Sequence, residues 1–107
     1  MNYIESIVKI LESPKYKKIG KNTYITEFRA QLPQIRQRSK IVRLVIWGKL
    51  ALDTINYYEI NDYILIEGYL FLQETSDSNL LKQNLKKVKI KILKVYPFLL
   101  DSNRFIK

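Results

Sequence analysis

Residues 41–58 read IVRLVIWGKLALDTINYY, and the spacing of the apolar residues changes once within this stretch. As far as Trp47 every second residue on one side is apolar, at Val42, Leu44 and Ile46. Such alternation is typical of a half-buried β-strand. From Gly48 onward the apolar positions recur at helical spacing, at Ala51, Ile55 and Tyr58. The stretch therefore predicts a strand that is followed directly by a short helix.

Four further segments alternate with the period of two that indicates a strand. They are residues 2–12, 23–32, 63–72 and 85–98. Turn-forming residues at 13–14 and 20–22 enclose the basic cluster KYKK at 15–18, which is interpreted as a flexible connection. The inward positions of these strands are predicted to complete the core: Ile4, Val8, Ile10, Tyr24, Thr26, Phe28, Ala30, Leu32, Ile64, Ile66, Leu70, Leu72, Val88, Ile90 and Ile92.

The elements then follow the order strand, strand, strand, helix, strand, strand, which is the order of the OB-fold. The predicted fold class is all-β with one short helix, a five-stranded barrel with its helix between strands three and four. At 107 residues the chain is expected to form one domain, residues 1–107, with a core at about 2–97 and a C-terminal tail at 98–107. In OB-folds the second and third strands commonly form a nucleic-acid-binding face.

The charge of the chain favours an anionic partner. Nineteen Lys and Arg residues against ten Asp and Glu give a net charge of +9. A balance of this sign points to nucleic acid ahead of an acidic membrane surface. No apolar run approaches the roughly 18 residues of a membrane span, and Glu5 and Ser6 interrupt what would be the core of a signal peptide. A soluble protein that is not secreted is expected.

The composition also argues against an enzyme. The chain contains no Cys and no His, which excludes thiol nucleophiles, the commonest zinc ligands and imidazole acid–base chemistry. The carboxylates of Glu27, Asp53 and Glu67 are isolated, without the spacing of a catalytic pair or a metal site. We therefore expect a binding protein without catalytic residues, metal or cofactor.

Two short motifs resemble the bacterial single-stranded DNA-binding protein family. They are Trp47-Gly48-Lys49-Leu50-Ala51 and, about eighteen residues later, Ile66-Glu67-Gly68-Tyr69-Leu70. The Lys-Gly turn of the family is replaced by Ile60-Asn61, and Asn tolerates a positive φ. The resemblance covers roughly residues 2–97 and is greatest to plastid-encoded, tail-less members from algae and to primosomal single-OB proteins. It implies an OB-fold that binds single-stranded DNA without strong sequence preference, in DNA replication or genome maintenance, in a plastid or otherwise in the cytoplasm.

The resemblance also suggests site residues. Trp47 takes the place of a base-stacking Phe, Arg43 matches a basic position on the same strand face, and Lys49 matches a Lys near the phosphate path. Arg29, on the preceding strand, is predicted to face outward like Arg43 and to contact phosphate. The connection between these two strands adds three more cations to the predicted phosphate-binding groove: Arg36, Arg38 and Lys40.

Other stacking aromatics of the family are missing, because this chain has Ile41, Gln34-Ile35 and Glu74-Thr75 in the corresponding regions. Tyr69 and Phe71 face outward on the strand after the helix and are predicted to replace part of that stacking. The row Lys87, Lys89 and Lys91 is interpreted as a solvated edge rather than a binding surface. Gly48 and Gly68 are expected to permit close approach of backbone within the barrel.

Alternatives remain open at this point. OB-folds also bind RNA, and stacking and phosphate contacts alone do not reject a 2′-hydroxyl group. A structural subunit of a primosome or ribosome would fit the same residues. The resembled families act as oligomers, and the outward apolar residues Tyr63 and Leu65 favour a homodimer or homotetramer. The acidic-tipped tail of the bacterial family is absent, so enzymes recruited by that tail are not expected as partners.

Overall fold

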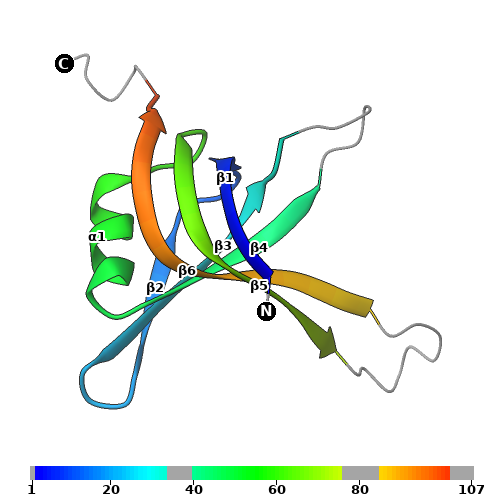
Figure 1. The fold of residues 1–107 in the computed structure, drawn as a ribbon. Coiled ribbons are helices and arrows are strands. Elements are labelled where there is room, and N and C mark those ends of the chain that lie inside the picture. The colour runs from blue at the N-terminus through cyan, green and yellow to red at the C-terminus, as the bar shows by residue number, and fades with distance from the viewer. Residues whose placement is uncertain (1, 34–39, 76–84, 102–107) are drawn as a thin grey trace.

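The computed structural model describes residues 2–33, 40–75 and 85–101 (Figure 1). The elements in chain order are β1 (Asn2–Ile10), β2 (Lys15–Ile19), β3 (Thr23–Gln31), β4 (Ile41–Trp47), α1 (Lys49–Tyr57), β5 (Tyr63–Thr75) and β6 (Leu85–Leu99). No helix within these residues combines the length and the apolar character that a membrane crossing requires.

Five of the strands close into a ring. β1 pairs with both β3 and β5, β3 pairs with β4, β4 pairs with β6 in parallel, and β6 pairs with β5. This is the OB-fold barrel that the element order predicted. The helix lies between β4 and β5 when β2 is counted. Within the ring of five it still connects the third strand to the fourth, as expected.

The basic cluster at 15–18 is not a flexible connection, and this interpretation was wrong. Residues 15–19 form β2, which pairs antiparallel with β3 from Lys15 opposite Glu27 to Ile19 opposite Thr23. The predicted turns on either side are confirmed, since β2 begins after Pro14 and ends at Ile19, just before Gly20. All five residues of β2 are exposed, so the strand leaves no apolar alternation in the sequence.

The core agrees with the predicted inward positions, with one exception. Its buried members are Val8, Ile10, Phe28, Ala30, Val42, Leu44, Ile46, Ala51, Tyr58, Ile64, Ile66, Ile90 and Ile92. Thr26 is also buried, and its hydroxyl donates to the carbonyl of Ala51, which ties α1 to β3. Leu72 is the exception, 56% exposed, because the outer part of the β5–β6 hairpin runs beyond the barrel (Figure 1).

Two residues that alternate with the inward positions of β3 and β4 are nevertheless buried. Ile25 is 8% exposed and Val45 is 6% exposed. Both lie on the outer side of the sheet, where Ile25 is directly opposite Trp47 and Val45 directly opposite Glu27. Their neighbours across the sheet are Lys17 and Trp47 for Ile25, and Glu27 and Lys91 for Val45, and alternation within one strand does not reveal such neighbours.

Three positions were predicted from the sequence to need special backbone geometry. The predictions for Asn61 and Gly68 are confirmed, whereas Gly48 is required for a different reason than predicted. Asn61 has φ 76°, as its replacement of a glycine predicted. A Cβ on Gly68 would lie 2.1 Å from the carbonyl oxygen of Lys91, so close backbone approach is the reason for that glycine. Gly48 is different, because a Cβ would meet nothing within 4 Å but φ is +72°. Its role is the left-handed turn from β4 into α1.

The fully buried Asp62 joins the segment after α1 to the segment after β6. Its carboxylate accepts hydrogen bonds from the backbone N–H groups of Glu59 and Asp101, both at 2.8 Å. Two residues assigned to the tail, 98 and 99, belong to β6. Residues 102–107 lie outside the described part of the chain.

Candidate nucleic-acid interface

The strand register shows which side chains share the outward side of the sheet. Residues directly opposite one another on neighbouring strands project to the same side. Arg43 is opposite Arg29 on β3 and Lys89 on β6, while Val45 is opposite Glu27 and Lys91. We call this side of β2, β3, β4, β6 and β5 the outer face. It carries Lys15, Lys17, Ile25, Glu27, Arg29, Arg43, Val45, Trp47, Lys89, Lys91, Tyr69 and Phe71.

Trp47 is exposed on the outer face. It is the last residue of β4 and its side chain is 46% exposed. Its neighbour across β3 is the buried Ile25, and the next residue across the sheet is Lys17 on β2. The indole is therefore not packed beneath the helix. It lies beside cations on an accessible surface, as a stacking platform requires.

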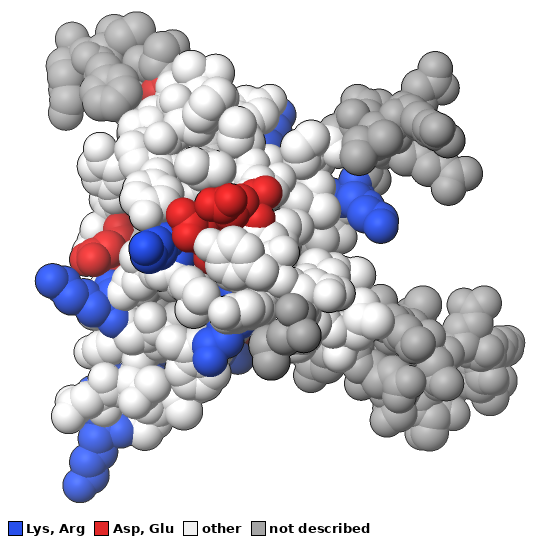
Figure 2. Space-filling model, viewed as in Figure 1, with Lys and Arg blue, Asp and Glu red and all other residues white. Residues whose placement is uncertain are grey.

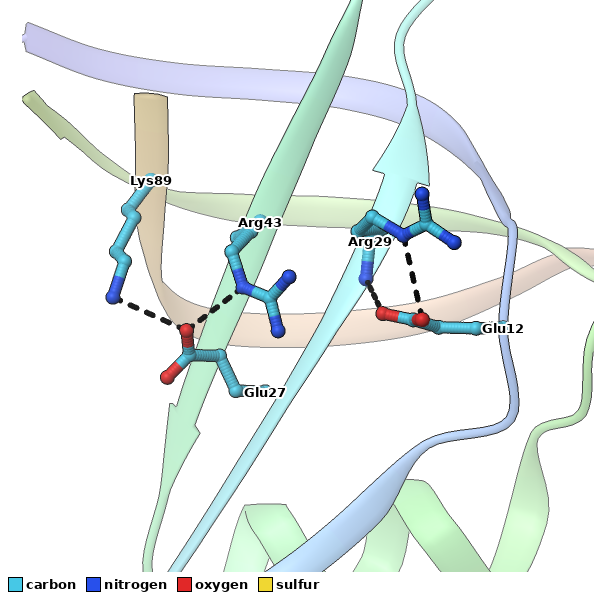
Figure 3. A network of polar contacts seen from close by, with 5 residues as sticks. All are labelled: Glu12, Glu27, Arg29, Arg43 and Lys89. Carbon is cyan, nitrogen blue, oxygen red and sulfur yellow. Dashed lines mark hydrogen bonds and ion pairs between the residues drawn. The ribbon is translucent and has the colours of Figure 1, made fainter. Parts of the chain in front are cut away.

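Arg43 and Lys89 share one carboxylate oxygen (Figure 3). Oε2 of Glu27 accepts from Nε of Arg43 at 2.9 Å and from Nζ of Lys89 at 3.1 Å. Lys89 is only 15% exposed in its side chain, and β6 pairs with both β4 and β5 at this position. The interpretation of Lys89 as part of a solvated edge was wrong, because Lys89 is ion-paired in the middle of the sheet.

Arg29 has its own carboxylate partner, Glu12, in the connection between β1 and β2. Nε of Arg29 donates to Oε1 of Glu12 at 3.3 Å, and the backbone N–H of Arg29 donates to Oε2 at 2.8 Å. Both arginines predicted to contact phosphate are thus engaged through Nε (Figure 3). Among the described residues, no hydrogen bond engages the terminal Nη groups of either arginine. These groups retain the planar donor arrangement that suits a phosphate.

Both carboxylates are held in the charged form. The backbone N–H of Arg29 is the largest cause that lowers the pKa of Glu12, and the charge of Arg29 adds to it. Burial acts to raise the pKa of Glu27, but hydrogen bonds from Arg43 and Lys89 outweigh it, so that the pKa falls below its ordinary value. Glu12 and Glu27 are therefore anionic near neutral pH.

Tyr69 and Phe71 lie on the outer face as predicted, but on the far side of β6 from Trp47. Tyr69 is opposite Lys91 and Phe71 is opposite Lys89. Phe71 is 40% exposed, whereas the Tyr69 ring packs edge-on against Tyr3 with centroids 5.6 Å apart. Phe71 is thus the more accessible of the two aromatic rings.

Tyr3 belongs to a second, acidic surface. Its hydroxyl donates to the carboxylate of Glu67, which raises the pKa of Tyr3 to about 12. Acidic side chains gather over β1 and β5, where Glu5 lies directly opposite Glu67 (Figure 2). This surface would repel a polyanion, so the outer face of β3 and β4 is the better candidate for nucleic acid.

The remaining predicted cations are distributed around this face. Lys49 is exposed at the first position of α1, directly after Trp47-Gly48, and Lys40 is exposed just before β4. Arg36 and Arg38 lie outside the described residues. Lys15 and Lys17 were missed as outer-face residues, since the strand that orders them has no apolar alternation. They extend the basic surface onto β2.

Comparisons with known proteins identify relatives of the chain. No family model matches the chain. It is 42% identical over 110 residues to a Trieres chinensis protein named "Putative single-stranded DNA-binding protein ycf41", covering 100% of this chain and 97% of that protein. A protein of the same name from Porphyra purpurea is 27% identical over 100 residues, covering 92% of this chain and 87% of that protein.

Solved structures show the same fold. The SSB domain of a Synechococcus protein superposes with a TM-score of 0.69 at 21% identity, covering 90% of this chain and 94% of that one. The second single-stranded DNA-binding protein of Mycobacterium smegmatis superposes with a TM-score of 0.72 at 22% identity, covering 98% and 93%. Together with the full-length match to the Trieres chinensis relative, these similarities show that the chain belongs to the OB-fold family of single-stranded DNA-binding proteins.

Proposed function

We propose that this protein binds single-stranded DNA, without strong sequence preference, on the outer face of β3, β4 and β6. The observation that carries the proposal is the exposed ring of Trp47 on the same side of the sheet as Arg29, Arg43 and Lys91. Exposed aromatic rings stack on bases of any identity, and cations beside them neutralise the backbone. The family relationship supports the same conclusion.

In this mechanism a base stacks on Trp47 while neighbouring phosphates contact the cations on either side. Lys17 lies across β3 from Trp47, Lys49 begins α1 directly after Trp47-Gly48, and Arg43 precedes Trp47 on the same side of β4. Phe71 offers a further stacking ring beyond β6. The carboxylates of Glu12 and Glu27 are occupied by ion pairs, which favours a binding role over catalysis.

We infer a homodimer or homotetramer. Residues 2–9 of β1 pair with β5, whereas within the described part of the chain β1 pairs with β3 only at Lys9 and Ile10. One edge of β1 is therefore available to another strand. Beside it lies an apolar pocket of about 460 Å³ whose lining includes Ile7, Leu32, Pro33, Tyr63, Phe98 and Leu99. A second copy of the chain is the partner that would cover this edge and pocket.

The biological setting is part of the proposal. The similarity to relatives named as single-stranded DNA-binding proteins supports a role in DNA replication or genome maintenance, which we propose takes place in a plastid. With few exposed aromatic rings on the outer face, the protein should hold single strands more weakly than family members that carry several.

Competition among oligo(dT), oligo(U) and duplex DNA at fixed salt tests the proposal, with the emission of the single tryptophan as the signal. We expect quenching by oligo(dT), weaker competition by oligo(U) and little by duplex DNA. Preference for oligo(U) would instead assign the protein to RNA. Absence of binding to every strand would leave a structural role in a larger assembly and would refute the proposal.

A further inference from the structure

Glu27 is the acidic residue at the centre of the outer face. The sequences of β2, β3, β4 and β6 contain no other Asp or Glu. Glu27 lies opposite Lys15 on β2 and opposite Val45 on β4, and Val45 in turn lies opposite Lys91. An anion at this position is surrounded by the cations that a phosphate backbone would need.

The contacts of Glu27 engage two of those cations directly. Both run through a single oxygen, Oε2, to Arg43 at 2.9 Å and to Lys89 at 3.1 Å. The three side chains are 33%, 15% and 23% exposed for Arg43, Lys89 and Glu27 respectively. Because the Lys89 side chain is largely buried and its Nζ is paired with Glu27, we expect it to be available to an external anion only if Glu27 moves or loses its charge.

The ion pairs of Glu27 stabilise the sheet when no nucleic acid is bound. Arg29 and Arg43 lie directly opposite each other, and like charges in such a pair destabilise a sheet. Glu27 and Glu12 offset that repulsion. A carboxylate and a phosphate compete for the same donors, however, so the contacts that help the free sheet oppose the binding of a polyanion.

We propose that Glu27 limits the affinity of the nucleic-acid interface, as an internal anion that occupies Arg43 and Lys89 in the free protein. The proposal rests on the proposed function. A backbone phosphate reaches Arg43 from the Nη side, which points away from Glu27 (Figure 3), and shares the guanidinium with it. Lys89 stays neutralised by Glu27 and contributes little to binding.

The test compares the wild-type protein with Glu27→Gln by titration with fluorescently labelled oligo(dT) at several salt concentrations. The amide keeps the shape and one acceptor but removes the charge. We expect the affinity for oligo(dT) to rise about three- to tenfold at low salt, since one negative charge beside the phosphate backbone of the DNA is lost. The slope of log affinity against log salt should steepen by about 0.7, because one more phosphate is neutralised.

Asp53→Asn is the matched control. Asp53 is exposed on α1 and is not one of the outer-face residues, and its substitution changes the net charge by the same amount. We expect little change in affinity or slope for this variant. An equal gain in Asp53→Asn would overturn the proposal, since the effect would then come from net charge alone. Equal or weaker binding by folded Glu27→Gln would overturn it as well.

A second variant covers the case in which Glu27→Gln fails to fold because Lys89 loses its partner. The double substitution Glu27→Gln with Lys89→Met removes the pair and leaves the net charge unchanged. It should still bind more tightly than the wild type, because Arg43 is released, and equal or weaker binding would overturn the proposal. If the wild-type protein binds no single strand at all, the proposed function fails instead, so the two failures are distinguishable.

Discussion

Arg29 and Arg43 lie directly opposite each other on β3 and β4, and each is held through its Nε by a different carboxylate. Glu12 approaches from the β1–β2 connection, and Glu27 lies two residues before Arg29 on β3. The pair therefore presents two oriented guanidinium groups side by side. Pre-oriented donors lose less conformational entropy on binding than free ones.

Trp47→Ala should weaken binding of single-stranded DNA by about 1–3 kcal/mol, because one base loses its stacking partner. Trp47→Phe should retain most of the affinity, since the ring remains. Anisotropy of a labelled oligonucleotide measures both variants without the indole signal. Unchanged affinity in a folded Trp47→Ala protein would remove Trp47 from the interface.

Lys17 and Lys18 make a matched pair on β2. Lys17 is opposite Ile25 and shares the outer face with Trp47, whereas Lys18 is opposite Tyr24 and projects to the other side. Lys17→Gln should weaken binding and reduce the salt slope by about 0.7, the contribution of one phosphate on a single strand. Lys18→Gln should change neither quantity. Equal effects in titrations at three salt concentrations would argue against a phosphate path over β2.

The assembly depends on the outward side of β1 in the proposed oligomer. Ile7 lies opposite Leu65 on β5, which lies opposite Tyr96 on β6, so a charge at Ile7 would enter an apolar row. Ile7→Glu should shift the sedimentation mass toward that of the 12.8 kDa chain. Ile19→Glu on β2 is the control and should leave the assembly unchanged. A wild-type protein that sediments as a monomer at micromolar concentration would contradict the prediction.

Stability should fall on acidification. Glu12 and Glu27 have folded-state pKa values below the ordinary 4.5, so the unfolded chain takes up protons before the folded one as the pH falls. The stabilisation is complete above about pH 5 and is lost as the pH falls through the folded-state values. Urea unfolding from pH 7 to pH 3 measures this. The acid-induced loss should be smaller in Glu27→Gln, and an identical loss would contradict the assignment.

The two motif glycines should differ in their response to alanine. Gly48→Ala places a side chain at φ 72° and ψ −143°, a conformation nearly confined to glycine, with free space around it, at a cost of about 1–3 kcal/mol. Gly68→Ala drives a Cβ against the carbonyl of Lys91, so backbone pairing between β5 and β6 must shift. We expect a larger loss of stability for Gly68→Ala by thermal unfolding. The reverse order would show that the β5–β6 pairing relaxes more easily than the turn.

The sequence predicted the barrel strands, the helix and most of the core, because one-sided burial imposes a period on the chain. It also predicted the positive φ of Asn61, whose side chain tolerates that conformation. It missed β2, which buries neither side, and placed Leu72 in the core because alternation does not show where a barrel ends.

The polar contacts of the site were beyond the reach of the sequence for a different reason. The link from Glu27 to Arg43 and Lys89 joins three strands, and it depends on the register between them. A single strand's pattern reveals which residues share a side, but not which residues on other strands they meet. Outward orientation of Trp47 and Arg43 was therefore predictable, while their partners were not.

The parallel pairing of β4 with β6 constrains the order in which the molecule can fold. It joins residues 43–45 to residues 89–91, and β1 pairs with β5 across a similar distance along the chain. Such non-local pairings make folding slow, because long loops must close before the contacts form. The ring cannot close on the ribosome until β6 has emerged. Until then β4 exposes the edge that β6 will cover, and the nascent chain is most vulnerable to aggregation at that stage.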